Sequence, residues 1–461
     1  MSGSMETTRT VSKYLRHHAV GSHWSLVSAG TGGVDTVVVI PALAESAHLF
    51  KTLASLARNP EVDLRRTLVL CVINNRPPGH ASPEDIADNQ RTLQIIDALV
   101  HGRGLGGAVA RSAPGGPIDE IAASSLRLAA VDASSPGREL PARDGGVGLA
   151  RKIGGDLALS LLHGEGGEDG LLLSLDADTL VEAHYLAAVR ETFEREDCVA
   201  SVVSFAHRLP GGGERAAIIC YELFLRYYVM GLAHARSPYA FHSIGSTMAC
   251  RAGAYAAVRG MSRRRAGEDF YFLNKLAKVG PIAATESTTV HPSARVSDRV
   301  PFGTGKRVGR FLGGGQEEYL VYDPAVFAVL RSWLSFLSSL GSSGAEEILS
   351  RAREIHPGLE EFLVTQRFRE VWPRLVANSG SDEGLRRAFT HWFDGFRTMK
   401  LIHHLTRGDI PPVGMFAALR RLTAARGEEI SLGEGDGALP DLRRQEEILR
   451  RLRALDGCRS K

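Results

Sequence analysis

The sequence predicts an α/β fold, with a mixed, mainly parallel sheet flanked by helices and a helical domain after it. In residues 34–200, continuous apolar runs alternate with segments whose apolar residues recur at helical spacing. Strands that alternate with helices favour a parallel sheet covered on both faces. Beyond residue 315 only helical patterns continue, separated by glycine and serine. We therefore expect a flexible N-terminal arm over 1–33, an α/β domain over 34–314 and a helical C-terminal region over 315–461.

Four segments have the composition of buried strands. The first, VDTVVVIP, is continuous, rich in β-branched residues and ended by a proline, as in the centre of a parallel sheet. A helical pattern lies between each strand and the next. The expected strands are 34–41, 65–75, 126–134 and 171–180, and the expected helices are 44–59, 82–100 and 146–163. The glycine-rich segment 102–116 has only a weak pattern and is expected to be a surface loop.

The expected strands end in polar residues. In open α/β sheets, ligands bind outside the carboxyl ends of the strands. That rule brings the following residues to one edge of the sheet: 41–45, Asn74 and Asn75, Asp132, Asp176 and Asp178. Four polar strand ends on one edge predict a site large enough for a nucleotide.

Composition excludes several classes of protein. With 44% hydrophobic and 23% charged residues among 461, the chain has the composition of a globular protein. A net charge of +3 is too balanced to indicate a nucleic-acid-binding protein. The five cysteines include no CxxC pair, which argues against a zinc cluster and a disulfide framework. The N-terminus lacks the apolar core of a secretory signal, and no stretch of about 20 residues is continuously apolar, so we expect a cytoplasmic protein without a transmembrane segment.

The stretch LLLSLDADTL, residues 171–180, ends in two carboxylates one residue apart. Two unrelated chemistries use such a strand end: a metal-bound nucleotide-sugar transferase, and a phosphatase whose first aspartate attacks phosphorus. A phosphatase of the haloacid dehalogenase type has DxDxT on the first strand of its core and a lysine ahead of a later acidic pair. Here three strands precede the motif, the threonine follows Asp178 directly, and the acidic pair in GEDF comes before Lys275 or Lys278. The phosphatase is kept as an alternative.

The order of several motifs resembles family 2 glycosyltransferases, whose fold is called GT-A. VVVIPALAESAHLFKTLASLA resembles their opening strand and helix, and GVGLARKIGGDLAL resembles the glycines, basic residue and helix that precede their DxD strand. LLLSLDADTLVEAHYL resembles the DxD strand itself. FHSIGSTMACRAGAYAAVRGM followed by GEDFYFLNKLAKVG resembles their acceptor-side segment. The resemblance covers residues 34–310 and implies a transferase that moves a sugar from a nucleotide-diphosphate sugar to an acceptor hydroxyl.

The resemblance also implies roles for the acidic residues. Asp178 is expected to bind a divalent metal, Mn or Mg, and Asp176 to contact the sugar or ribose and to share the metal. His291 is expected as a third metal ligand, because glycosyltransferases of this fold often bring a late histidine to the metal. Asp269 is the expected catalytic base of an inverting reaction, with Glu268 as the second choice. The competing interpretation is helix capping, by Asp178 or Thr179 after the strand and by the GED segment before FYFLNKLAKV.

Further residues are expected to contact the nucleotide sugar. They are Pro41, Glu45, Asn74, Asp132, Arg151, Asp176, Arg299 and Lys306. The resemblance implies that Asp132 meets the base and Arg151 the pyrophosphate. The loop that carries Arg299 and Lys306 has glycine hinges and cations suited to phosphates. Helix capping by Glu45 and a plain basic surface loop are the alternatives.

Some properties stay open at this stage. The donor sugar and nucleobase are not specified, and the acceptor is a small molecule, a glycan or a lipid-linked group. Whether the reaction inverts or retains the anomeric configuration is also open, because related folds that retain it use a DxD motif and a late histidine too. Processive family members carry a QxxRW motif and membrane helices, and neither is present, so we do not expect synthesis of an extruded polymer. A catalytically inactive GT-A-like domain used for protein interaction is the non-enzyme alternative.

Overall fold

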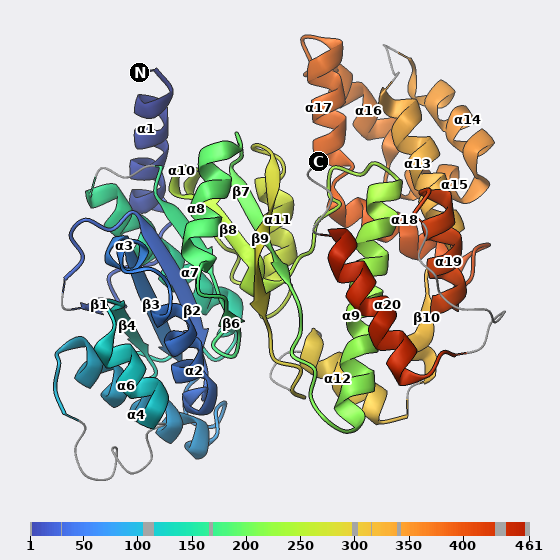
Figure 1. Ribbon diagram of the computed structural model, residues 1–461. Coiled ribbons are helices and arrows are strands. Elements are labelled where there is room, and N and C mark those ends of the chain that lie inside the picture. The colour runs from blue at the N-terminus through green and yellow to red at the C-terminus, as the bar shows by residue number, and fades with distance from the viewer. Residues whose placement is uncertain are drawn as a thin grey trace. The chain divides into compact units, whose positions relative to one another are not determined.

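A computed structural model describes residues 2–28, 30–104, 115–165, 169–296, 303–314, 316–338, 343–428 and 439–456 (Figure 1). The chain forms two compact units. The α/β unit contains Met1–Arg208 and Ser243–Gly303, and the helical unit contains Leu209–His242 and Thr304–Leu455. Most of the expected surface loop 102–116 lies outside the described residues.

The α/β unit is built on one nine-stranded mixed sheet, in the order β1-β4-β3-β2-β5-β8-β7-β9-β6 (Figure 1). Its strands are β1 (Leu26–Ser28), β2 (Thr36–Ala42), β3 (Thr67–Asn74), β4 (Arg127–Ala133), β5 (Leu171–Ser174), β6 (Leu180–Val181), β7 (Ala200–Phe205), β8 (Met248–Arg251) and β9 (Ile282–His291). The four neighbours β4, β3, β2 and β5 run parallel. β8 runs antiparallel to both β5 and β7. The predicted α/β class with a mixed sheet is confirmed.

The central strands explain why their polar residues cluster at the ends. Every residue of β2 and β3 is buried, because parallel strands are covered on both faces. Apart from the threonines that begin the two strands, Thr36 and Thr67, polar side chains lie at the edge where the strands end. Asn74 ends β3, Asp132 lies at the end of β4, and Asp176 follows β5 at this edge.

Helices cover the sheet. They are α2 (Ser46–Ala57), α3 (Glu61–Arg66), α4 (Pro83–Val100), α6 (Gly115–Ala123), α7 (Val147–Gly164), α8 (Tyr185–Arg195), α10 (Ala252–Ala257) and α11 (Glu268–Leu276). α7 approaches the sheet most closely where it carries glycine: a Cβ on Gly154 would lie 2.3 Å from Val39 Cγ1. This close packing fixes α7 against β2, and Arg151 lies three residues before that contact.

The N-terminal helix α1 (Ser2–His17) is attached to α7 by a buried polar network. Tyr14 Oη donates to Asp156 Oδ1 over 2.6 Å, and Tyr255 Oη donates to the same oxygen over 2.8 Å. Lys152 Nζ lies 2.9 Å from Asp156 Oδ2 and donates to Tyr14 Oη over 2.6 Å. Burial, followed by the charge of Asp156, raises the pKa of Tyr14, so its phenol stays protonated and can donate.

The structure differs here from the expected flexible arm over 1–33. Residues Ser2–His17 are helical, and Val11 and Tyr14 are at most 2% exposed. Because residues three apart lie on the same helix face, these two side chains form one apolar contact surface. The sequence pattern was too short to reveal this surface without its partner, α7.

The helical unit begins earlier in the chain than predicted. Its helices are α9 (Gly213–His234), α12 (Thr304–Leu312), α13 (Pro324–Ser338), α14 (Ala345–Ile355), α15 (Pro357–Thr365), α16 (Phe368–Ala377), α17 (Asp382–Trp392), α18 (Gly395–Arg407), α19 (Met415–Ala425) and α20 (Leu442–Asp456). The sequence predicted residues 209–242 and 304–314 within the α/β domain. They belong instead to the helical unit.

Residues 209–242 belong to the helical unit because α9 has an apolar surface that packs into the core of that unit. Ile219, Leu223 and Tyr227 are fully buried in the core of the helical unit together with Phe327 of α13. A Cβ on Gly231 would lie 2.4 Å from the Phe327 ring, so the two helices meet closely at that glycine. Among the described residues α9 is the one helix long and apolar enough to cross a membrane, and 67% of its most apolar window is buried inside the protein, as expected of a core helix.

We predict that Asp156→Ala destabilises the protein by about 3 kcal/mol, because it leaves Lys152 buried without its charge partner. The side chains of Lys152 and Asp156 are only 6% and 1% exposed. The free energy of unfolding in urea measures the loss.

The matched control is Glu191→Ala, which removes an ion pair on the surface. Arg195 and Glu191 are 73% and 46% exposed, so this change should cost less than about 1 kcal/mol. Equal losses in the two variants would contradict the anchoring role of the network.

Candidate active site

Arg151 joins the end of β5 to the start of α11. It lies in the second turn of α7, and its side chain is only 5% exposed. Its two Nη atoms donate to Glu268 Oε1 and Asp176 Oδ1, and Nε donates to Ser174 Oγ over 3.1 Å. Burial lowers the pKa of Arg151, but the charges of Asp176 and Glu268 outweigh burial and raise it. Arg151 therefore stays charged and holds two segments of the chain together.

Two glycines make room for this ion-pair group. A Cβ on Gly245 would lie 2.2 Å from Arg151 Nη2. A Cβ on Gly148 would lie 2.2 Å from the carbonyl oxygen of Arg264 and 3.1 Å from Glu268 Cβ. Protein interiors are close-packed, so no side chain fits at either position without moving its neighbours. Lack of space for a side chain thus explains why glycine occurs at these positions in the GVGLAR and SIGST segments.

The DADT motif forms a turn in which both carboxylate oxygens of Asp176 accept hydrogen bonds. Asp176 Oδ1 accepts from Arg151, and Oδ2 accepts from Ser246 Oγ over 2.6 Å. Ser246 Oγ also lies 2.9 Å from Thr179 Oγ1. The N–H of Thr179 donates to the carbonyl oxygen of Asp176 over 3.1 Å, and β6 follows directly at Leu180. The motif therefore lies between two strands, and helix capping does not explain its aspartates.

Asp269 is the acidic group of the site with the most unusual pKa. It is the second residue of α11, and among the described residues it forms no ion pair. Its Oδ1 accepts from the N–H of Phe270 over 2.7 Å. Burial, followed by the negative charge of Glu268, raises the pKa of Asp269 from 3.8 to about 7, although Arg151 opposes the shift. A carboxylate that titrates near neutral pH is suited to general base catalysis.

Asp178 and Glu45 share one arginine. Arg295 Nε donates to Asp178 Oδ2 over 2.9 Å, and its Nη2 donates to Glu45 Oε1. Burial, followed by the charge of Asp176, raises the pKa of Asp178 even though Arg295 lowers it. Glu45 is 7% exposed and precedes α2 without capping it through its side chain. Glu45 is thus the N-cap residue of α2 through its backbone carbonyl, while its carboxylate pairs with Arg295 and lies 3.4 Å from His48 Nδ1.

His291 does not join the two aspartates in a ligand set. Its Nε2 lies 3.6 Å from Glu182 Oε1, and its Nδ1 lies 3.2 Å from the carbonyl oxygen of Ala206. In the parts of the chain that the structure describes, no three His, Cys, Asp or Glu residues are grouped so that they could hold a metal ion. Metal binding by Asp178, Asp176 and His291 stays a prediction.

The residues expected to contact the nucleotide have varied surroundings. Asn74 Nδ2 donates to the carbonyl oxygens of Ala42 and Val72, over 3.0 and 3.1 Å, and so ties the ends of β2 and β3 together. Asp132 Oδ1 accepts from the N–H groups of Ser134 and Ser135 in the turn after β4. These side chains shape the edge of the sheet.

Four further expectations can be placed or set aside. Pro41 is buried within β2, opposite Val72 of β3. Arg299 lies outside the described residues. Lys306 belongs to α12 of the helical unit. Arg151, expected at the pyrophosphate, is instead fully occupied by Asp176, Glu268 and Ser174.

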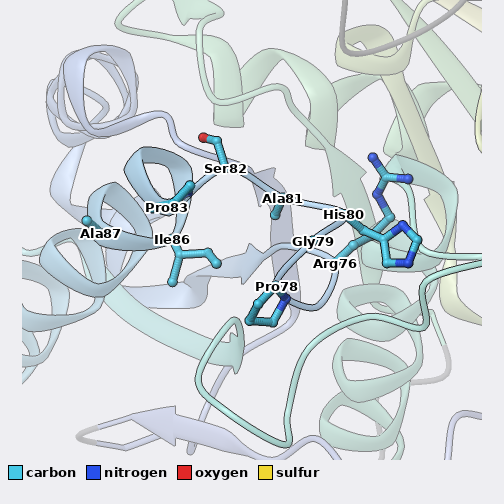
Figure 2. Close-up of a pocket in the computed structure, with 9 residues that line it drawn as sticks. All are labelled: Arg76, Pro78, Gly79, His80, Ala81, Ser82, Pro83, Ile86 and Ala87. Atoms are coloured by element: carbon cyan, nitrogen blue, oxygen red, sulfur yellow. The ribbon is translucent and has the colours of Figure 1, made fainter.

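An open hollow lies at the end of β3. Figure 2 shows that it is formed by the loop after this strand and the first turns of α4. Its volume is about 910 Å³, and Arg76 and His80 are the basic residues in its lining. Arg76 packs beside the segment that enters α7, because a Cβ on Gly145 would lie 2.9 Å from Arg76 Cγ. The hollow thus adds basic side chains at the carboxyl end of a central strand.

Sequence reasoning missed two residues of the site, Ser246 and Arg208. Ser246 hydrogen-bonds to Asp176, and Arg208 Nη2 donates to the carbonyl oxygen of Asp178 over 2.7 Å. Both reach the DADT turn from distant parts of the chain. The one local signal was Gly245, whose missing side chain indicates a close approach at the residue before Ser246.

Comparisons with known proteins find structural but no sequence-level matches. No protein-family model and no curated protein matches the chain. S. aureus TarS 1-349 in complex with UDP-GlcNAc matches over 78% of this chain and 92% of its own, with 13% identity and a TM-score of 0.37. Mannosyltransferase PcManGT from Pyrobaculum calidifontis, in complex with GDP-Man and Mn2+, matches over 100% and 96%, with 15% identity and a TM-score of 0.34.

The chain is thus similar over most of its length to these two structures. TM-scores below 0.5 add no argument about activity. The case for a function rests on the site itself.

The pKa of Asp269 predicts a pH-dependent difference in stability between the wild type and Asp269→Asn. A raised carboxyl pKa stabilises the fold at low pH, and this contribution is lost as pH rises from about 4 through about 7. Asparagine does not ionise. The free energy of unfolding of the variant, relative to that of the wild type, should therefore increase by on the order of 3 kcal/mol over this pH range. Urea unfolding at pH 4, 5.5 and 8 measures the difference.

Asp119→Asn is the matched control, because Asp119 is exposed and lies on a different helix, α6. Its difference from the wild type should change less with pH than that of Asp269→Asn. A constant difference for Asp269→Asn would contradict the raised pKa.

Proposed function

We propose that this chain is a glycosyltransferase that uses a nucleotide-diphosphate sugar as donor. The observation that carries the proposal is the ion-pair group of Arg151, which joins Asp176 at the end of the central strand β5 to the helix that presents Asp269. A sugar transferase needs an acidic strand end for its donor and a base for its acceptor. Arg151 holds both elements in one fixed arrangement.

In the proposed reaction Asp269 acts as the general base. It accepts the proton of the acceptor hydroxyl while the hydroxyl oxygen attacks the anomeric carbon. The bond from that carbon to the phosphate oxygen breaks, and the nucleoside diphosphate leaves with the electron pair. A single displacement of this kind inverts the anomeric configuration. Glu268, which is 3% exposed and paired with Arg151, is a positioning residue that holds the start of α11.

Asp176 and Asp178 are proposed to lie at the donor diphosphate. Their carboxylate oxygens suit Mg or Mn, because such ions often combine one or two carboxylates with phosphate oxygens of the substrate and need no complete protein cage. A divalent cation bound there would neutralise the charge of the leaving diphosphate. Arg295 holds Asp178 in the structure, so donor binding is proposed to draw this guanidinium from Asp178 to a phosphate.

The phosphatase alternative has weaker support. Its nucleophile would be Asp176, which must offer an open oxygen to phosphorus. Both carboxylate oxygens of Asp176 accept hydrogen bonds, from Arg151 and from Ser246. Attack on phosphorus would cost the pairing with Arg151, whereas a metal could use the lone pairs that remain on this carboxylate, which is 37% exposed, and leave the pairing intact.

The proposed function predicts metal-dependent binding of a nucleotide sugar. In a thermal-shift screen of UDP-, GDP- and dTDP-sugars with Mn2+, one nucleotide at about 100 times its dissociation constant should add about 2.7 kcal/mol of stability. Asp178→Asn should lose this gain, and Asp97→Asn, on the exposed surface of α4, should keep it.

Two outcomes would count against the proposal. No stabilisation of the wild type by any nucleotide sugar would leave the inactive interaction domain as the better account. Hydrolysis of p-nitrophenyl phosphate that Asp176→Asn abolishes, without nucleotide binding, would establish the phosphatase.

Asp269 as base predicts a specific pH profile for sugar-nucleotide hydrolysis with water as acceptor. Because the base must be ionised, kcat/KM, which reports the pKa of the free enzyme, should rise with pH and level off above about 7. Asp269→Asn should lower kcat by at least about 100-fold and remove this rise. Glycosidic hydrolysis measured from pH 5 to 9 checks both, and an unchanged profile in the variant would assign the base to another residue.

A further inference from the structure

The helical unit contains a cavity whose lining residues have no role in the proposed transfer reaction. Its volume is about 220 Å³. The walls come from α13, α16, α17 and α18 and from the turn after α9. Trp372, Phe389 and Phe393 supply aromatic surface, and Leu334 supplies aliphatic surface.

The aromatic walls are rigidly packed. The rings of Phe389 and Phe393 are stacked, with centroids 5.8 Å apart and planes 10° apart. Trp372 meets Phe389 edge-on, at 6.2 Å and 67°. An apolar cavity of about 150 Å³ stays dry and takes up benzene, so this one has room for one aromatic ring and a small substituent. Aromatic walls favour a ring because offset and edge-on contacts add to area burial.

Two arginines give the cavity a polar, cationic side. Arg236 and Arg386 line it, and both are exposed. In the part of the chain that the structure describes, neither guanidinium forms an ion pair. The next arginine on the same helix behaves differently, because Arg387 pairs with Glu383 over 3.3 Å. Two cations without carboxylate partners beside an apolar cavity are complementary to a ligand that combines an apolar body with a negative charge.

The turn that carries Arg236 is held in place. α9 ends in a Schellman-type turn, in which the N–H of Arg236 donates to the carbonyl oxygen of Ala233 and that of Ser237 to Leu232, over 2.9 Å each. Arg236 has a φ of 56°, the left-handed conformation that usually belongs to glycine at this position. Tyr239 Oη donates to the carbonyl oxygen of Thr390 over 3.0 Å, which ties the turn to α17, the helix of Arg386.

We propose that this cavity binds a small aryl anion. The ring lies against Trp372, Phe389 and Phe393, and its carboxylate or phosphate group pairs with Arg236 and Arg386. This site lies within the helical unit and is independent of the proposed transferase site.

Titration of the full-length protein with benzoate and with phenyl phosphate tests the proposal. Tryptophan fluorescence reports binding, because Trp372 lines the cavity and Trp333 packs on Phe389 with ring centroids 5.9 Å apart. At least one of the two anions should bind saturably with one-to-one stoichiometry, confirmed by calorimetry. The anion that binds more tightly identifies the preferred head group. Benzyl alcohol, which keeps the ring but lacks the charge, should bind at least about ten-fold more weakly.

Variants separate the two parts of the site. Arg386→Gln should weaken binding of the anion about ten-fold, while Arg387→Gln, on the same helix, should leave it unchanged. Arg236→Gly should weaken binding similarly without lowering the melting temperature, because glycine accepts the left-handed conformation. Leu334→Phe should fill the cavity and abolish binding. Asp178→Asn, in the α/β unit, should bind the anion like the wild type.

The proposal is overturned if neither anion binds saturably to the wild type, or if benzoate and benzyl alcohol bind equally. It is also overturned if Arg386→Gln and Arg387→Gln bind alike. If Leu334→Phe fails to fold, the charge variants still decide, since both arginines are on the surface. Binding of the anion without binding of any nucleotide would contradict the proposed transferase function but would support this site.

Discussion

The candidate site depends on one buried guanidinium. Arg151 reaches from α7 to Asp176 after β5 and to Glu268 at the start of α11, two residues that are far apart in the chain. Burying a guanidinium is costly unless it is paired and hydrogen-bonded. Arg151 meets this condition with two carboxylates and the hydroxyl of Ser174. The strand that ends in DADT and the helix that begins with the ED pair are therefore fixed to each other by charge, and α7 is fixed to both.

The same group explains the chemistry available to Asp269. Asp176, Glu268 and Asp269 are three carboxylates near one cation, and the charges of Glu268 and Asp176 raise the pKa of Asp269. Asp176 and Glu268 hydrogen-bond directly to Arg151. Asp269 has no such partner, so burial and the charge of Glu268 raise its pKa. Neighbouring carboxylates can therefore have different roles because their environments differ. Here Asp176 and Glu268 hold Arg151, and Asp269 is the proposed base.

The sequence was sufficient for features that depend on local pattern. Asp176 and Asn74 were placed correctly at strand ends because buried parallel strands are continuous apolar runs that stop where polar residues begin. The sequence was not sufficient for side chains whose contact partners come from a distant part of the chain. Arg151 was expected at a pyrophosphate because a cation beside glycines does not show which carboxylates it meets. His291 was expected beside Asp178 by family resemblance, but its position opposite Leu180 in the β6–β9 pair turns its imidazole to Glu182. The predicted and observed boundaries of the helical unit differ for the same reason. The sequence shows that α9 has an apolar surface but not which helices pack against it.

The central claim is that Arg151 pairs with Asp176 and Glu268, while burial and the charge of Glu268 raise the pKa of Asp269 to about 7. Carbon-13 NMR titration of the Asp269 carboxyl, in the wild type and in Glu268→Gln, tests it without any knowledge of donor or acceptor. In the wild type the carboxyl should titrate near pH 7, and in Glu268→Gln its pKa should fall, because a neighbouring negative charge is removed while Arg151 remains. Titration near the ordinary aspartate pKa in the wild type, or the same pKa in both proteins, would contradict the account.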